Sequence, residues 1–134
     1  MPYPSFKSDL DQAIDPLVVA LDVGSTACRG AVYDAAGRPV VKRTKVAHQF
    51  TTDSAGTSTI DPDQVVDELG RILDALTEQD LAGRVGGVAL DTFASSLVGV
   101  DEDGNAITPC YTYADSRCSA EVDELRGKLD EAEV

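Results

Sequence analysis

Residues 22–29 combine residue types that can bind a phosphate group together with a metal ion. Asp22 is followed by Gly24, Ser25, Thr26 and Arg29. A glycine lets the backbone turn tightly, so the amides and hydroxyls of Ser25 and Thr26 can point at an oxygen-rich anion. Because a carboxylate repels phosphate, Asp22 is suited to hold Mg²⁺ or its water shell, which then bridges to the phosphate. The spacing predicts a phosphate loop with Asp22 as its metal-binding residue.

The same residue types also suit an ordinary turn between two strands. Two other phosphate motifs do not fit, because the Gly-Lys-Ser/Thr of the P-loop and the Gly-x-Gly-x-x-Gly of dinucleotide-binding folds are both absent here. A buried strand is predicted before the segment and a hairpin after it. This context favours the phosphate loop over a simple turn.

A second group of candidate binding residues lies at Tyr111, Tyr113, Asp115 and Arg117. The two tyrosines alternate as in a strand and by themselves would be packing residues, while Asp115 would be a turn or helix-cap residue. His48 is the only histidine of the sequence and falls on a predicted outer strand, so we expect it at the surface rather than as a base.

Neither a cysteine-based metal site nor a calcium loop is predicted. The three cysteines lack Cys-x-x-Cys spacing and are expected to be reduced and buried. The acidic segment 101–105 suggests calcium, but an EF-hand needs Gly at its sixth position and Glu at its twelfth. Counted from Asp101, those positions hold Ala106 and Thr112.

The elements that would position these residues begin with the apolar run Leu17–Leu21, which is typical of a strand buried on both faces. A second strand is predicted at Arg29–Tyr33, followed by a glycine turn at Asp34–Gly37. Pro39–Phe50 is predicted to return as a third, antiparallel strand, and Asp53–Thr59 to form a polar loop.

A helix is predicted from Pro62, with Asp61 as its cap. Its apolar face is expected to contain Val65, Val66, Leu69, Ile72, Leu73 and Leu76. Its solvent face is expected to contain Asp67, Glu68, Arg71 and Asp74. A fourth strand follows at Val88–Leu90, and a helix between two strands implies parallel pairing in one sheet.

Ser96–Val100 and Ala106–Thr108 flank a turn and are predicted to form a second hairpin. Residues 119–134 are predicted to be helical. Residues 1–16 are polar with three prolines and are expected to be a flexible leader, which leaves one small domain over residues 17–134. Because that domain ends without a C-cap glycine or a closing strand, we expect it to be truncated.

Three antiparallel strands, a helix and a further strand are the opening of the actin-like ATPase, or ribonuclease H-like, fold of the α/β class. Residues 21–26 followed by Arg29 resemble the phosphate motif of FGGY carbohydrate kinases, Asp-x-Gly-Thr/Ser-Thr/Ser and then Arg. Residues 99–117 are similar to that family's hairpin and Trp-x-Asp-x-Arg segment, with Tyr113 in place of Trp. The chain resembles a partial N-terminal FGGY domain, and its motif residues are most similar to those of gluconokinase-like members.

The resemblance implies an enzyme that transfers the γ-phosphate of ATP, with Mg²⁺, to a hydroxyl of a sugar, sugar acid or polyol. It assigns Asp22, Gly24, Ser25, Thr26 and Arg29 to the side that binds the ATP phosphates and the metal ion.

On the sugar side the resemblance assigns Ala94 and Ser95, where the family often has Met-His or Arg-Glu, together with Tyr113 and Asp115. Ser95 can still hydrogen-bond a hydroxyl, and Tyr113 keeps an aromatic face for the apolar edge of a sugar. Asp115 would accept hydrogen bonds from substrate hydroxyls, and Arg117 would order the loop.

The family's general-base aspartate and adenosine-binding motifs are expected beyond position 134. The resemblance therefore assigns no catalytic residue to this chain, which alone is expected to be inactive and to need the C-terminal portion of the kinase as its partner.

Net charge and hydropathy exclude several other classes. A net charge of −13 argues against a nucleic-acid binder, and the apolar runs are too short for a membrane helix or signal peptide. We expect a cytoplasmic protein. Two alternatives stay open: an acidic binding module without turnover, and an actin-like assembly or chaperone ATPase, which would not carry the Tyr113-x-Asp115-x-Arg117 segment.

Overall fold

The computed structural model describes residues 10–129, which form two compact units. The first contains residues 10–48 and 63–93, and the second contains residues 49–62 and 94–129. No helix within residues 10–129 has the length and apolar character that a bilayer crossing requires.

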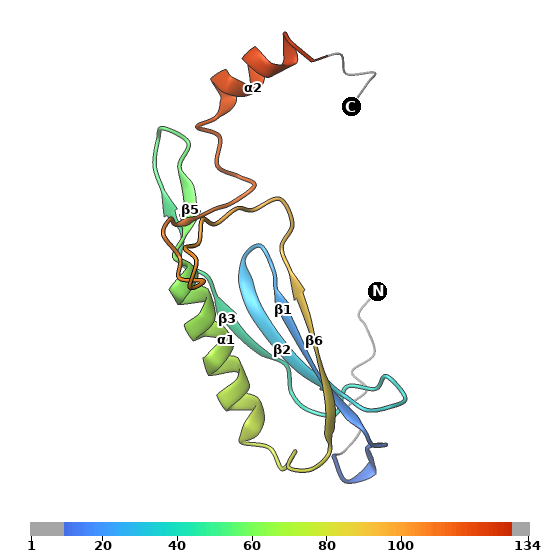
Figure 1. Cartoon of the computed structure of the whole chain (residues 1–134). Coiled ribbons are helices and arrows are strands. Elements are labelled where there is room, and N and C mark those ends of the chain that lie inside the picture. Colours follow the sequence, from blue (N-terminus) through green and yellow to red (C-terminus); the bar gives the residue numbers. More distant parts are fainter. Residues whose placement is uncertain (1–9, 130–134) are drawn as a thin grey trace. The chain divides into compact units, whose positions relative to one another are not determined.

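The first unit is a four-stranded sheet with a helix on one face (Figure 1). Its strands are β1 (Leu17–Val23), β2 (Ala27–Tyr33), β3 (Thr44–Ala47) and β6 (Val85–Thr92), in the order β3-β2-β1-β6. β1 pairs antiparallel with β2 and parallel with β6, which confirms the predicted crossover. The helix is α1 (Pro62–Thr77).

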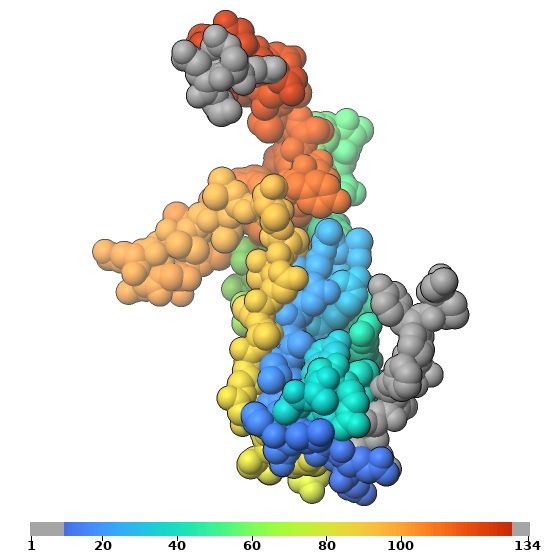
Figure 2. Space-filling model, turned by 90° about the vertical axis from the view of Figure 1, so that its right-hand side faces the viewer, coloured from blue at the N-terminus to red at the C-terminus, as the bar shows by residue number. Residues whose placement is uncertain are grey.

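β1 is buried on one face only. Leu17, Val19, Leu21 and Val23 are buried, whereas the residues between them are half-buried. The expectation of burial on both faces was wrong, because α1 covers a single face of the sheet. β6 is an edge strand that lies at the surface (yellow in Figure 2), and its Val88 and Leu90 side chains are exposed.

The helix α1 packs very closely on β2. Ile72 and Leu76 are completely buried against the sheet, and a Cβ on Gly30 would lie 2.3 Å from Ile72 Cγ2 and 3.1 Å from Leu76 Cδ1. Gly30 is therefore required by the approach of the helix. The assignment of helix faces was wrong at three positions, since Val66 is 67% exposed, Leu73 is 39% exposed and Glu68 is buried.

Glu68 is buried because of its helical position. It precedes Ile72 by four residues and follows Val65 by three, so all three lie on the same face of α1. The spacing of hydrophobic residues did not predict the burial of Glu68, because a charged residue was assigned to the solvent face by its type alone.

Three turns share one construction, Asp-x-x-Gly with the glycine at positive φ. Asp34, Asp53 and Asp101 each accept hydrogen bonds through Oδ1 from the amides two and four residues later. The glycines are Gly37, Gly56 and Gly104, with φ of 74°, 95° and 85°. At Asp34, Arg38 adds an ion pair of 2.6 Å, and these bonds together lower the pKa of Asp34 to about 2.

The predicted third strand is interrupted. Tyr33 lies opposite Pro39 and Gly30 opposite Thr44, so the two residues between Gly30 and Tyr33 face four residues, 40–43. The extra residues form a bulge, and regular pairing resumes only in β3. Beyond β3, Thr51–Thr52 form β4 in the second unit.

The residues before β1 are attached to the sheet where the structure describes them. Leu10–Gln12 form a 3-10 helix, and Arg84 donates hydrogen bonds to the carbonyls of Leu10 and Ala13 and pairs with Asp15. The flexible leader stays a prediction, although residues 10–15 make these contacts, and residues 1–9 lie outside the described part.

The second unit contains a small sheet in the order β4-β5-β7. β5 (Ser58–Ile60) pairs with β4 and with β7 (Cys110–Tyr111), so the segment predicted as a polar loop, Asp53–Thr59, is a turn followed by a strand. The predicted second hairpin is present as the bridge between Val100 and Ala106. The helix α2 spans Ser119–Arg126, and residues 130–134 of the predicted helix lie outside the description.

Replacing Gly30 by Ala should destabilise the first unit by about 1–3 kcal/mol, because the new methyl group overlaps Ile72 and the helix must shift. The matched control is Gly70→Ala on the exposed side of α1, where an added Cβ meets no atom within 4 Å. That change should stabilise the helix by about 0.5–1 kcal/mol. Urea unfolding of both variants measures the difference, and equal effects would contradict the close packing.

The Asp34 turn should make stability depend on pH in the acid range. The pKa of Asp34 falls from 3.8 to about 2 on folding, so its contribution is complete above pH 3.8 and is lost as pH falls to about 2. Asp34→Asn should therefore flatten the fall in unfolding free energy between pH 4 and 2. Urea titrations at several pH values test this, and identical slopes for both proteins would show that the turn carries no such dependence.

Candidate functional site

The predicted phosphate loop connects β1 to β2. The Gly24 amide donates to the Ala27 carbonyl at 3.1 Å and closes the turn. Asp22 and Arg29 lie directly opposite each other in the two strands, and Arg29 Nη1 donates to Asp22 Oδ2 at 3.0 Å. Both side chains are partly open to solvent, at 46% for Asp22 and 40% for Arg29.

Gly24 leaves room for the guanidinium of Arg29 in this ion pair. A Cβ at this position would lie 2.4 Å from Arg29 Nη1 and 3.3 Å from Asp22 Oδ1. Ser25 and Thr26 are exposed at the tip of the turn. The structure thus brings the five residues predicted for the phosphate side together on one short loop.

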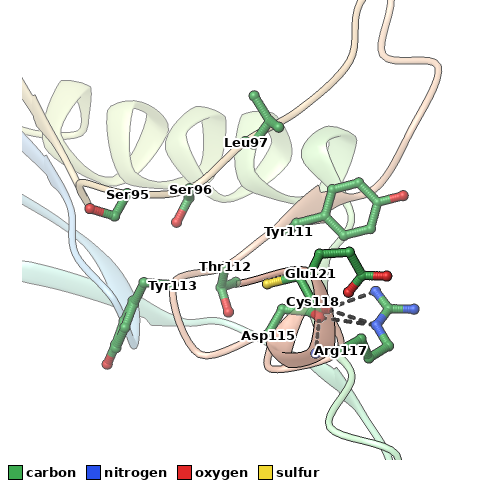
Figure 3. Close-up of a pocket in the computed structure, with 10 residues that line it drawn as sticks. All are labelled: Ser95, Ser96, Leu97, Tyr111, Thr112, Tyr113, Asp115, Arg117, Cys118 and Glu121. Atoms are coloured by element: carbon green, nitrogen blue, oxygen red, sulfur yellow. Dashed lines mark hydrogen bonds and ion pairs between the residues drawn. The ribbon is translucent and has the colours of Figure 1, made fainter. Parts of the chain in front are cut away.

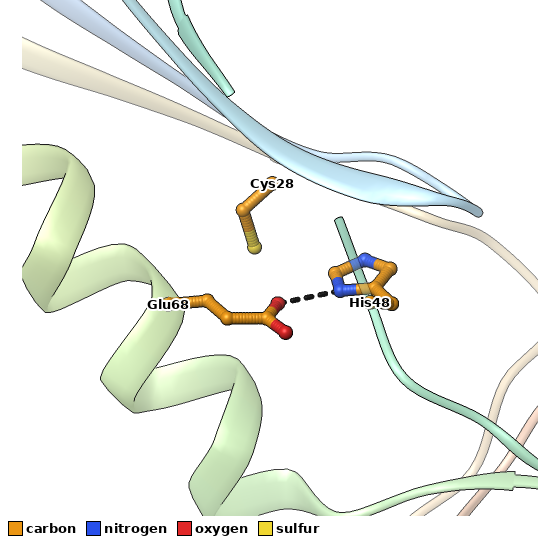
Figure 4. A group of neighbouring side chains, drawn as sticks. All are labelled: Cys28, His48 and Glu68. Carbon is orange, nitrogen blue, oxygen red and sulfur yellow. Dashed lines mark hydrogen bonds and ion pairs between the residues drawn. The ribbon is translucent and has the colours of Figure 1, made fainter. Parts of the chain in front are cut away.

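The loop is attached to the interior of the first unit by His48. Its ring Nε2 lies 2.8 Å from the Gly24 carbonyl oxygen, and its backbone amide donates to the Thr26 carbonyl at 3.1 Å. Nδ1 lies 2.6 Å from Glu68 Oε2 (Figure 4). The expectation that His48 is a surface residue was wrong, because its side chain is fully buried.

Cys28 on β2 completes a buried cluster with His48 and Glu68. One ligand atom of each of the three residues lies within 4.8 Å of the other two. Burial, followed by the charge of Glu68, raises the pKa of the Cys28 thiol to about 11, so the thiol is protonated at neutral pH. Cys110 is also buried, but Cys118 is exposed, which corrects the prediction that all three cysteines are buried.

The candidate sugar residues of the second unit line an open pocket of about 880 Å³ (Figure 3). One wall comes from the segment Ser95–Leu97, and the other from the segment that includes Tyr111, Tyr113 and Asp115. Ala94 is not among the lining residues.

Asp115 organises the second wall. Its carboxylate accepts hydrogen bonds from Arg117 Nε and Nη2 and from the Ser58 amide, and only 11% of its side chain is exposed. The Arg117 guanidinium holds the pKa of Asp115 well below its usual range. Arg117 also lies 5.6 Å from the centre of the Tyr111 ring, a cation–π contact.

Tyr113 and the two serines offer polar and aromatic groups to the pocket. Tyr113 is 67% exposed and lies at the end of the pocket away from Arg117 in Figure 3. Ser95 has a φ of 57°, a left-handed conformation that costs a serine energy and often accompanies binding sites.

Ser96 was missed by the sequence reasoning. Its Oγ is buried and has no hydrogen-bond partner among the described residues. The only signal in the sequence is its place beside Ser95. An unpaired buried hydroxyl at the edge of a pocket is suited to bind a hydroxyl group of a ligand.

Comparison with known proteins identifies relatives of this arrangement. Residues 17–134 match the N-terminal domain of the FGGY family of carbohydrate kinases. A gluconokinase of Bacillus subtilis (strain 168) is 21% identical over 117 residues, which cover 87% of this chain and 23% of the relative. A xylulose kinase of Staphylococcus xylosus is 29% identical over 116 residues, which cover 84% of this chain and 23% of the relative.

A solved structure shows the same fold. The crystal structure of xylulose kinase from Rhodospirillum rubrum matches with a TM-score of 0.78 and 25% identity, over 87% of this chain and 24% of that protein. The chain therefore spans about a quarter of the length of the proteins it matches.

Proposed function

This chain belongs to the FGGY family of carbohydrate kinases, and from that premise we propose that it supplies the ATP-phosphate loop and part of the sugar pocket of an ATP-dependent kinase. The proposed acceptor is a hydroxyl of a sugar, sugar acid or polyol. The two curated relatives, a gluconokinase and a xylulose kinase, support a polyhydroxylated substrate. We assign no general base among residues 10–129.

The observation that carries the proposal is the loop at the end of β1. Gly24 leaves space between Asp22 and Arg29, and Ser25 and Thr26 are exposed at the tip. These amides and hydroxyls would bind the terminal phosphates of ATP, and the positive charge of Arg29 would offset the repulsion between Asp22 and the phosphates.

Mg²⁺ fits the donor set of this loop. Mg²⁺ prefers oxygen ligands and keeps several of its waters, so a single half-exposed carboxylate is an adequate protein ligand. Arg29 donates a hydrogen bond to Oδ2 of Asp22, so Oδ1 is the oxygen that would hold the ion or one of its waters. When bound, the ion would neutralise negative charge that develops on the phosphoryl oxygens.

In the pocket of the second unit, Tyr113 would pack against the apolar edge of the sugar while Ser95 and Ser96 bind its hydroxyls. Asp115 already accepts hydrogen bonds from the Ser58 amide and from the side chain and backbone amide of Arg117. A carboxylate has about four acceptor sites, so a substrate hydroxyl would bind Asp115 by replacing one of the longer bonds, such as that from the Arg117 amide at 3.3 Å. Because Ala94 and Ser95 are smaller than the residues that the family often has at these two positions, we propose a substrate preference different from that of xylulose and glycerol kinases.

Asp22→Asn should weaken binding of Mg-ATP about tenfold, since it removes the charge that holds the metal ion, a loss of about 1.4 kcal/mol. Titration of the chain with ATP, monitored at the Ser25 and Thr26 amides by NMR, gives the affinity with Mg²⁺ and with a chelator. Without Mg²⁺ the variant should bind ATP at least as tightly as the natural chain, because it lacks the carboxylate that repels the phosphates. Asp67→Asn, on the exposed side of α1, is the control, and a loss that persists in the chelator would contradict the metal role.

Tyr113→Ala and Asp115→Asn should reduce binding of sugars and leave binding of Mg-ATP unchanged, because both residues line the pocket of the second unit. A panel of D-gluconate, D-xylulose and glycerol tested by ligand-observed NMR measures this. Ile107→Ala, an exposed residue outside the pocket, is the control. An equal loss of sugar and ATP binding would show that the two substitutions disturb folding and do not act on the sugar site.

A further inference from the structure

We propose that His48 is a positioning residue for the phosphate loop, and that Glu68 fixes its ring. The two residues form a buried clamp between helix α1 and the carbonyls of Gly24 and Thr26 (Figure 4). The role in ligand binding rests on the proposed function of the loop, whereas the effect on loop order does not.

The geometry explains how a contact on the inner side of the loop orients its outer side. The carbonyl of Gly24 and the amide of Ser25 belong to one planar trans peptide group, so they point in opposite directions. Because the carbonyl points inward to His48 Nε2 at 2.8 Å, the Ser25 amide points outward, to the side where an anion would approach. The His48 amide donates to the Thr26 carbonyl at 3.1 Å, which fixes the peptide group between Thr26 and Ala27.

The hydrogen-bond partners show which atoms of His48 and Glu68 carry protons. A carbonyl oxygen only accepts, so Nε2 of His48 carries a hydrogen and donates it to Gly24. A second proton lies between Nδ1 and Glu68 Oε2, which are 2.6 Å apart. Gln64 donates to the other oxygen of Glu68 at 2.8 Å, and Phe93 packs edge-on against the imidazole ring. The ring is therefore held in one orientation from several sides.

A metal site made of Cys28, His48 and Glu68 fits the distances less well. Zn²⁺ would need about 2 Å to each ligand atom and a thiolate sulfur. The short Nδ1–Oε2 hydrogen bond occupies the space between two of these ligands, and burial raises the pKa of the Cys28 thiol, which Zn²⁺ would have to deprotonate.

The test compares loop order and ligand binding in three variants and one control. His48→Phe fills a similar volume without hydrogen bonds, whereas His48→Gln keeps an N–H that can reach the Gly24 carbonyl. Glu68→Gln keeps a hydrogen-bond partner for Nδ1 of His48 but removes the charge. This variant tests the same contact if His48→Phe does not fold. Ile72→Val removes one methylene from the same helix face and makes no polar contact with the loop, so it controls for lost stability alone.

The readouts are ¹⁵N relaxation of the Ser25 and Thr26 amides without ligand, and the Kd for magnesium pyrophosphate. His48→Phe should mobilise both amides and raise the Kd about three- to tenfold, the effect of losing one hydrogen bond. His48→Gln should restore both values to within about twofold of the natural chain, and Ile72→Val should change neither.

Three results would overturn the inference: unchanged loop relaxation in both His48→Phe and Glu68→Gln, equal loop mobility in Ile72→Val, or stoichiometric Zn²⁺ binding that Cys28→Ser abolishes. Failure of the natural chain to bind magnesium pyrophosphate would count against the proposed function alone. The relaxation data of the ligand-free chain would still decide whether His48 orders the loop.

Discussion

The close approach of α1 to β2 at Gly30 is the constraint on which the first unit depends. Without a Cβ at this position, the helix settles against the sheet and buries Ile72 and Leu76. One helical turn earlier, the same face of α1 carries Glu68, which therefore reaches His48 beneath the proposed phosphate loop. A packing requirement in the middle of the sheet thus determines the geometry of the loop at its end.

Much of this arrangement could be predicted from residue types and their spacing. The apolar run of β1, the start of α1 at Pro62 and the parallel crossover to β6 are dictated by local patterns and by the handedness of chain connections. The loop residues also follow from the short motif that contains Gly24. The clamp could not be predicted, because His48 and Glu68 are polar residues whose burial depends on each other, 20 positions apart.

The acidic composition has a structural use besides its effect on net charge. Asp34, Asp53 and Asp101 each close an Asp-x-x-Gly turn, and Asp115 pairs with Arg117. A net charge of −13 by itself suggests only a solvated surface. The recurring turn motif would also have indicated the hairpin of β4 and β5, which was predicted as an irregular loop. Strands of two or three residues carry too little hydrophobic pattern to be found otherwise.

The two neighbours of β1 also differ in when they can assemble. β2 follows after the short phosphate loop, whereas residues 24–84 separate β1 from β6. Closing a longer segment costs more entropy, and hairpins form within microseconds. We therefore expect the β1–β2 hairpin, with the proposed phosphate loop at its tip, to close early in folding, before α1 packs on it. The loop reaches its final conformation later, when α1 packs on the sheet and Glu68 fixes the ring of His48.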